Sequence, residues 1–566
     1  MTDTAAPRAP AAGEWLAIVA AALVLVVASP QVFSAYWSPK VAVELCVLVP
    51  GLLALGWAAR AGDRAAIAGA GVVGVALVAT VLSPSPKLAF IGLYNQGTGW
   101  LYVALVMGMW ALGRRGSDTG ADRLVQVIVG AAALNAIVSW LQSAEVGTGV
   151  LFDLVDGRPP GLLGNPVHST ALFLGTFSLV LAYWRPAPKH GTPRIPDRWI
   201  YGFVGLLSSA IELAGGRIGL VVLVALAAIA LIRVDLRRGV PFVLAVVIGI
   251  GAGALAAPAG TGAASRVGGS GASAFDGRLD RWRLAPPAIE DRPVIGIGPG
   301  LYRRATSPYS TKASARAFGA DSLSADAHNV FVEYAVTTGI LGLAALLAWL
   351  VAAGRGARGG LAWFVVGGGI SLLLQPQSIA LTPVLALALG FANRTPQSRV
   401  PPPVRRTAVA VSLGGGVLAL VLAVTLLRGD ALMLETVTDL DPIVGRDAAS
   451  TLAVWPQSAR QEARAYSYRA IAERRAADWP RALRAARTAW TRDPSDPAAA
   501  NFLGSLELAH GSVPRADEAF ATALRWNPYS LVALEGRAAV AARRDDATAR
   551  RRWCTRVHEL APTRKC

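Results

Sequence analysis

Charged residues are scarce in this chain. Only 16% of its 566 residues are Asp, Glu, Lys or Arg, and 54% are hydrophobic. A typical soluble domain has about 25% charged residues. The shortage of charge excludes a wholly soluble globular protein of this length and favours a protein embedded in a membrane.

Cysteine and histidine are also rare, with three and five residues respectively. Cys46, Cys554 and Cys566 do not combine with histidines at spacings typical of a metal site. A disulfide between Cys554 and Cys566 is one option that nothing in the sequence selects. We also find no cluster of carboxylates typical of a metal-dependent site. We therefore expect no metal and no cofactor.

Long hydrophobic runs, in contrast, are abundant. Segments near 20 residues with almost no charge recur through the first 427 residues, and each could cross a bilayer core of about 30 Å. They lie near residues 15–35, 40–59, 65–82, 98–113, 123–142, 166–184, 199–214, 217–232, 240–258, 329–351, 359–375, 377–393 and 408–427. The first run lacks the basic start of a signal peptide and precedes many others, so we expect a retained helix. The predicted fold class is all-α, with a transmembrane domain of about 12 to 13 spans.

The distribution of basic residues predicts an orientation. A net charge of +18 would suit a nucleic-acid-binding protein, but Lys and Arg concentrate in alternate short loops. In membrane proteins the loops rich in Lys and Arg lie on the cytoplasmic side, so alternate loops lie on opposite sides of the membrane. We therefore expect no nucleic-acid partner, an amino terminus inside the cell, and extracytoplasmic loops at 83–97, 143–165 and 259–328. With thirteen spans, the carboxyl terminus is also extracytoplasmic.

Beyond Leu427 the sequence changes to Arg, Ala, Trp and Asp with helical periodicity. Pro494, Pro528 and Pro562 follow one another at intervals of 34 residues. The stretch ADEAFATALRWNP resembles the second helix of a tetratricopeptide repeat, a family with that period. The predicted organisation is a membrane domain over 1–427, a linker over 428–447, and an extracytoplasmic α-solenoid of tetratricopeptide-like repeats over 448–566. The alternative is a generic helical tail.

Several arginines lie in the loops predicted to be extracytoplasmic, where positive charge runs against the insertion bias. Arg158 is in DGRPPGLLGNP, Arg217 opens an apolar span after two glycines, and Arg278 and Arg281 lie in the long loop over 259–328. A snorkelling side chain is the simplest explanation for any one of them. Together they favour an anionic substrate, because guanidinium binds phosphate through paired hydrogen bonds.

A second pattern joins these arginines. Arg278 is followed by Trp282 and by the turn PVIGIGPG at 293–300, and then by His328-Asn329 and a Gly-x-x-Gly pair at Gly339 and Gly342. This combination resembles the O-antigen ligase and polymerase family of polytopic membrane glycosyltransferases. LSPSPKLAFIGLYNQGTG at 82–99, RPPGLLGNP at 158–166 and GGRIGL at 215–220 resemble further segments of that family, so the resemblance covers about residues 80–395 in order.

The resemblance implies a bacterial inner-membrane enzyme that transfers a glycan from an undecaprenyl-diphosphate carrier to an acceptor hydroxyl by one inverting displacement. Arg217 and Arg278, with Arg281 and Arg158 near them, would stabilise the diphosphate leaving group. His328 would be the general base, and Asn329 would orient the ring or a sugar. The acceptor could be a glycan, a lipid or a protein, and the repeats could bind a protein partner.

Other interpretations stay open. Within the same family, the chain could be a polysaccharide polymerase or a protein O-oligosaccharyltransferase. From another class, it could be a lipid-glycan transporter, although we find neither paired inverted repeats nor charged residues at mid-membrane positions. Glu44, Glu212 and Glu333 near span ends could pair with the arginines. Helical geometry predicts His328, Ala335, Gly339 and Gly342 on one face of a continuous helix over 329–351.

Overall fold

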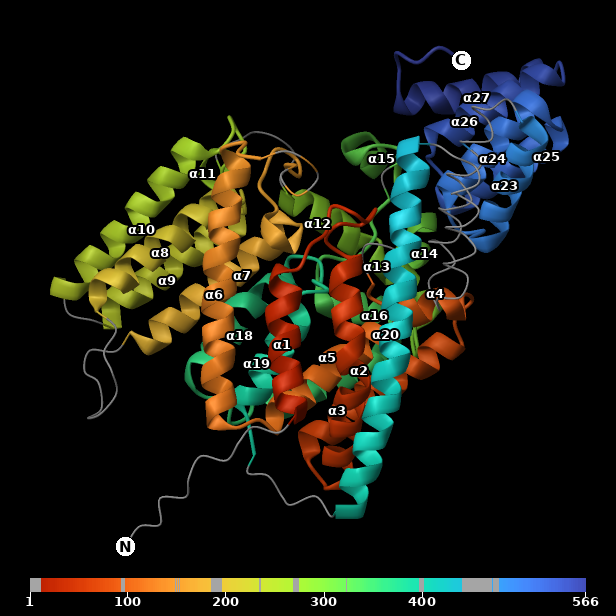
Figure 1. Cartoon of the computed structure of the whole chain (residues 1–566). Helices are drawn as coiled ribbons and strands as arrows, with labels where there is room; N and C mark the ends of the chain where they lie inside the picture. The colour runs from red at the N-terminus through yellow and green to blue at the C-terminus, as the bar shows by residue number, and fades with distance from the viewer. Residues whose placement is uncertain are drawn as a thin grey trace, which may run out of the picture.

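A computed structural model describes residues 12–92, 97–147, 149, 151, 153–184, 196–233, 236–267, 274–321, 323–395, 402–439, 471 and 478–566 (Figure 1). Within these residues every regular element is a helix, and β-type pairing is limited to an isolated bridge between Val155 and Arg158. The predicted all-α class is therefore confirmed.

Each of the thirteen predicted hydrophobic runs contains a helix. They are α1 (Ala12–Val26), α2 (Ser38–Arg60), α3 (Arg64–Val81), α5 (Trp100–Arg114), α6 (Asp118–Ser143), α7 (Pro166–Tyr183), α8 (Asp197–Leu213), α9 (Arg217–Arg233), α10 (Leu236–Ala256), α16 with α17 (Val330–Thr337 and Gly339–Gly354), α18 (Gly359–Gly369), α19 (Leu381–Ala392) and α20 (Pro402–Asp439). By length and composition, 6 helices of the described chain could cross a membrane, and further apolar helices have 10–17 residues. The chain therefore has the helices of a multi-pass membrane protein.

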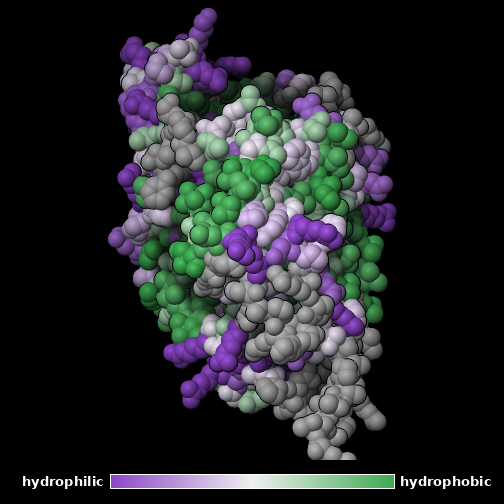
Figure 2. Space-filling view, turned by 90° about the vertical axis from the view of Figure 1, so that its left-hand side faces the viewer, coloured by the Kyte–Doolittle hydropathy of each residue, from purple (hydrophilic) through white to green (hydrophobic). Residues whose placement is uncertain are grey.

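The lipid-facing character of these helices shows on the surface. On α10, the exposed side chains include Leu244, Val247, Ile248 and Leu255. Figure 2, which looks onto the side of the molecule where α8, α9 and α10 lie, shows broad hydrophobic areas with hydrophilic residues between them near the middle of the face and at its top and bottom. Exposed apolar side chains of this extent are stable in lipid but not in water.

The first hydrophobic run ends earlier than predicted. We expected a span over 15–35, but α1 ends at Val26, shortly before Ser29-Pro30, where proline disfavours a continued helix. Lys40 of α2 is 1% exposed, and its ammonium donates to the carbonyls of Val27 (2.5 Å) and Leu162 (2.9 Å). The first of these bonds satisfies the Val27 carbonyl just beyond α1, and residues 27–37 form an irregular segment.

The predicted continuous helix over 329–351 is wrong. His328 precedes the helix with φ 51, α16 begins at Val330 after the cap Asn329, and the helix breaks at Gly339, where φ is 66. His328 therefore does not share a helix face with Gly339 and Gly342.

The break is filled by the glycine-rich turn at 293–300. Ile297 and Gly298 donate their backbone N–H groups to the carbonyls of Val336 (3.3 Å) and Thr337 (2.8 Å). In return, Ile340 and Leu341 donate to Pro293 (2.9 Å) and Val294 (3.3 Å). The turn thus replaces the hydrogen bonds that the helix loses at its break.

Two glycines make this close approach feasible. A Cβ atom on Gly339 would lie 2.4 Å from the Val294 carbonyl, and one on Gly296 would lie 2.5 Å from the carbonyl carbon of Thr337. Both residues also have positive φ, which glycine adopts without steric cost. The Gly-x-Gly-x-Gly and Gly-x-x-Gly signals of the sequence therefore meet in one contact.

The long segment between α10 and α16 folds into short helices above the bundle (Figure 1). They are α11 (Ala263–Val267), α12 (Ala274–Arg283), α13 (Ala285–Asp291), α14 (Tyr302–Thr306), the 3-10 helix η2 (Ser307–Tyr309) and α15 (Lys312–Phe318). The glycine-rich hinge predicted over 259–277 lies partly outside the described residues. A small helix, α4 (Pro86–Ile91), belongs to the loop predicted over 83–97.

The tail consists of antiparallel helices whose starts repeat. Within residues 478–566 they are α23 (Trp479–Arg492), α24 (Pro497–His510), α25 (Val513–Trp526), α26 (Leu531–Arg543) and α27 (Ala547–Leu560). The odd-numbered helices start 34 residues apart, as do the two even-numbered ones. Phe520 of α25 packs against Gly504 of α24 and Gly536 of α26, so neighbouring helices share one core. The first twelve residues of the predicted linker, 428–439, continue α20 as helix.

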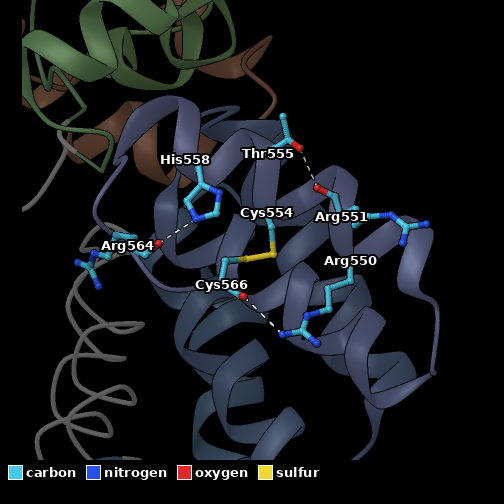
Figure 3. Close-up of a disulfide and its surroundings, with 7 residues drawn as sticks. All are labelled: Arg550, Arg551, Cys554, Thr555, His558, Arg564 and Cys566. Carbon is cyan, nitrogen blue, oxygen red and sulfur yellow. Dashed lines mark hydrogen bonds between the residues drawn. A yellow bond between two sulfur atoms is a disulfide. The ribbon is translucent and has the colours of Figure 1, made fainter.

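A disulfide joins Cys554 and Cys566 at the end of the chain (Figure 3). His558 Nε2 is 2.9 Å from the carbonyl oxygen of Arg564, which adds a second link between the terminal residues and α27. The last six residues are therefore folded back along the helix.

Candidate active site

A cavity of about 630 Å³ opens among the segments that follow or precede the apolar helices. Its walls come from residues 33–37, the start of α7, α12, η2, α15, the segment before α16, and residues 375–379. Among the residues predicted from the sequence, His328, Asn329 and Arg281 line it. Arg158, Arg217 and Arg278 are not among its lining residues.

His328 lies at the cavity with its ring fixed on one side. Its Nδ1 hydrogen-bonds Asp326 Oδ1, and its backbone N–H donates to the same oxygen at 2.8 Å. The His328 side chain is 24% exposed and the Asp326 side chain 15%. Since Nδ1 is occupied by Asp326, Nε2 is the ring nitrogen left for a substrate. Sequence analysis missed Asp326, although it stands only two residues before His328.

Asn329 has two roles that the structure makes visible. Its side-chain oxygen accepts from the N–H groups of Phe331 and Val332 and so caps α16. Its Nδ2 donates to the Leu373 carbonyl at 3.0 Å, while Arg278 Nε donates to the next carbonyl, Leu374, at 2.5 Å. Arg278 and Asn329 are thereby anchored side by side on one stretch of chain next to the cavity.

The remaining arginines form a cluster of positive charge with Arg278. Burial lowers the pKa of Arg278, and the positive charges of Arg281 and Arg217 lower it further. The pKa of Arg266 is lowered first by burial and then by Arg158 and Arg217. Arg278 and Arg266 therefore each lie near Arg217 and near one further arginine, Arg281 and Arg158 respectively. Arg266, in the glycine-rich segment, was not predicted from the sequence.

Two arginines of this cluster have an Nε donor without a hydrogen-bond partner among the described residues. The Nε atoms of Arg158 and Arg217 are buried and make no hydrogen bond within the described residues. Arg158 contacts one carboxylate, Asp156, at 3.3 Å. Buried, incompletely bonded guanidinium groups are costly unless an anion binds there. The carboxylates Glu212 and Glu333 instead accept from the backbone N–H groups of Ala264 and Ala327, at 2.9 and 2.8 Å.

Close packing explains why glycines precede Arg217. A Cβ atom on Gly215, which has φ 66, would lie 2.6 Å from Arg158 Cδ, and one on Gly216 would lie 2.9 Å from the Thr170 hydroxyl. The absence of side chains at these positions lets the segment with Arg158 approach the start of α9. This contact brings two predicted arginines together from positions 59 residues apart.

The tail touches the outer side of the cavity wall. Ser314 and Phe318 of α15 line the cavity, whereas Lys312 of the same helix pairs with Glu559 of α27 at 2.7 Å. Arg316 Nε donates to the Glu559 carbonyl at 2.8 Å. Just after α15, the Ala320 carbonyl accepts from Asn527 and the Asp321 carboxylate accepts from Ser530, at 2.8 and 2.6 Å. The short helix is therefore held between the cavity and the tail.

Comparison with protein families gives one finding. Residues 202–347 match the family described as O-antigen ligase. The match includes Arg217, Arg278, Arg281, His328 and Asn329, whereas Arg158 and the tail lie outside it. A search of curated proteins finds no match to the chain. The middle part of the chain is thus similar to O-antigen ligases, which supports a membrane glycosyltransferase-like enzyme.

Proposed function

We propose that the protein transfers a glycan from an undecaprenyl-diphosphate carrier to an acceptor hydroxyl at the extracytoplasmic face of a bacterial inner membrane. The observation that carries this proposal is a cavity lined by His328, with one ring nitrogen available, and by Arg281, which belongs to a cluster of half-buried arginines. The O-antigen ligase match over the same residues supports it.

The arginines act on the leaving group. Arg217 and Arg278, with Arg158, Arg266 and Arg281 near them, would bind the diphosphate through charge-assisted hydrogen bonds. Fixed cations aimed at charge that develops in the transition state are a major source of catalysis. Because guanidinium groups supply this charge, the proposed reaction is metal-independent.

The bond changes follow from this placement. The acceptor oxygen attacks the anomeric carbon of the donor glycan, and the bond from that carbon to the diphosphate oxygen breaks. The electron pair leaves with the diphosphate, and the acceptor's proton passes to Nε2 of His328. A single displacement of this kind inverts the anomeric centre. Asn329 keeps His328 at the start of α16 by capping that helix.

The tail is proposed to be an extracytoplasmic solenoid of tetratricopeptide-like repeats that binds the acceptor or a protein partner. The regular recurrence of helix starts supports the repeat assignment. The disulfide between Cys554 and Cys566 supports the extracytoplasmic location, because disulfides persist in oxidising compartments and not in a reducing cytosol.

The test uses the full-length protein in lipid with an undecaprenyl-diphosphate-linked glycan as donor. Wild-type protein should release undecaprenyl diphosphate and form a glycosylated acceptor. His328→Gln should bind the donor normally but turn over about 10²–10⁴-fold more slowly, because an amide cannot take the proton. His558→Gln, at an exposed histidine of the tail, is the matched control and should be fully active.

Two results would contradict the proposal. Movement of the intact donor across the membrane without release of undecaprenyl diphosphate would identify a transporter. Turnover of His328→Gln near the wild-type rate would exclude His328 as the base. Mass spectrometry of surface glycans from cells lacking the protein would distinguish a ligase from a polymerase or a protein glycosyltransferase, because each leaves a different product missing.

A further inference from the structure

The segment before α16 holds His328 in an unusual conformation. With φ 51, its backbone is in the left-handed region, which costs a residue with a Cβ atom free energy. Asp326 compensates for this cost, because one of its oxygens accepts from both the backbone N–H and the ring Nδ1 of His328. The carboxylate therefore fixes the backbone and the imidazole together.

The segment that carries Asp326 and His328 is held by two hydrogen bonds from other elements. The residue between it and the histidine, Ala327, donates its N–H to Glu333 Oε2 of α16 at 2.8 Å. The Ala327 carbonyl accepts from the indole Nε1 of Trp282 in α12 at 2.9 Å. The Ala327 backbone is fully buried, so the segment cannot turn away from the cavity without losing both bonds.

The charge state of Asp326 decides which ring nitrogen of His328 carries the hydrogen. Burial acts to raise the pKa of Asp326, but its hydrogen bonds with His328 and the positive charge of Arg281 lower it below the ordinary value. Asp326 is therefore ionised near neutral pH, and a carboxylate can only accept hydrogen bonds. The hydrogen between the two groups must belong to Nδ1. A neutral imidazole has one N–H, which leaves a lone pair on Nε2.

We propose that Asp326 is a positioning residue that selects the tautomer of His328 competent to accept a proton at Nε2. The catalytic role of Asp326 rests on the proposed function, whereas its effect on the tautomer of His328 does not. Without Asp326 either ring nitrogen could carry the hydrogen, and a ring protonated at Nε2 presents a donor to the acceptor hydroxyl where a base is needed.

The decisive variant is Asp326→Asn. It keeps the size and shape of the side chain, but its amide nitrogen can donate to Nδ1 and so place the ring hydrogen on Nε2. Asp326→Glu, which retains a carboxylate, should restore part of the activity. Asp291→Asn, at an exposed position of the same extracytoplasmic region, removes the same charge without touching the histidine and should behave like wild type.

The first measurement needs no substrate. Histidine labelled with nitrogen-15 reports which ring nitrogen carries the hydrogen, and the chain has only five histidines. In the full-length protein in lipid, the signals of His328 are identified by their absence in His328→Gln. We expect Nδ1–H in the wild type and in Asp291→Asn, and a gain of the Nε2–H form in Asp326→Asn.

The second measurement is transfer from the lipid-linked donor. Asp326→Asn should lower kcat by about 10²–10⁴-fold, the contribution of a positioned base, with the KM for the donor unchanged. An Nε2–H form in the wild type, or an unchanged Nδ1–H form in Asp326→Asn, would overturn the inference. Absence of transfer by the wild type would instead refute the proposed function, and the tautomer measurement would still decide the role of Asp326.

Discussion

Replacing Gly339 by alanine tests the contact between the glycine-rich turn at 293–300 and the break between α16 and α17. Alanine at positive φ costs about 1–3 kcal/mol. Its Cβ would lie 2.4 Å from the Val294 carbonyl, and overpacking of this kind costs about a further 1–3 kcal/mol. The change should therefore destabilise the docked turn by about 2–6 kcal/mol.

The free energy that holds the turn is of the same size. Four backbone hydrogen bonds join it to the break, and each contributes about 0.5–1.5 kcal/mol net, or about 2–6 kcal/mol together. We therefore expect the turn to leave its site in a large fraction of Gly339→Ala molecules, while the apolar helices stay folded. Because the turn lies between α12 and α16 in the chain, transfer activity should fall with it.

Hydrogen–deuterium exchange measures this opening directly. The N–H groups of Ile297, Gly298, Ile340 and Leu341 are bonded only while the turn is docked. Their exchange should accelerate more than tenfold in Gly339→Ala, since tenfold corresponds to about 1.4 kcal/mol. Gly354→Ala is the control, because a Cβ atom at this position of α17 meets nothing within 4 Å. Equal exchange in the two variants would refute the argument.

Three further predictions concern the arginines, the tail and the topology. Arg278→Lys and Arg217→Lys should lose most transfer activity while the protein still inserts, because an ammonium cannot make the paired hydrogen bonds of a guanidinium. Arg283→Lys, at an exposed position, is the control. Near-normal transfer by both variants would mean that Arg278 and Arg217 only snorkel. Combined Lys312→Ala and Arg316→Ala should loosen the tail from α15 and raise its protease sensitivity, whereas unchanged sensitivity would show that these contacts do not hold it. In intact cells, a membrane-impermeant thiol reagent should label Glu518→Cys but not Arg198→Cys, both at exposed positions, and the opposite result would invert the proposed orientation.

Sequence patterns predicted the helices well, because hydrophobic length is a local property. All thirteen runs contain helices, and the proline spacing of the tail matched the recurrence of helix starts. The end of the first helix was placed too late, since runs of apolar residues continue past Val26 and hydropathy alone does not register the stop at Ser29-Pro30.

The site was predicted less completely, because its geometry depends on contacts between distant segments. The left-handed backbone of His328 and the break at Gly339 cannot be recognised from an apolar run, since both depend on bonds to Asp326 and to a turn about 40 residues upstream. Asp326 could have been found, because a carboxylate two residues before a histidine can bond its backbone and its ring. Arg266 could not, because its segment carries no motif.

The position of α15 between the cavity and α27 has a consequence for how the protein is made. The wall that contains Ser314 and Phe318 is braced by Glu559 of α27, which follows α20 in the chain. A ribosome therefore synthesises that residue after the apolar helices from α1 to α20. If the tail must cross the membrane, fold and form its disulfide before it can brace α15, then a nascent or truncated chain has an unfinished cavity. We expect such chains to lack the proposed transfer activity.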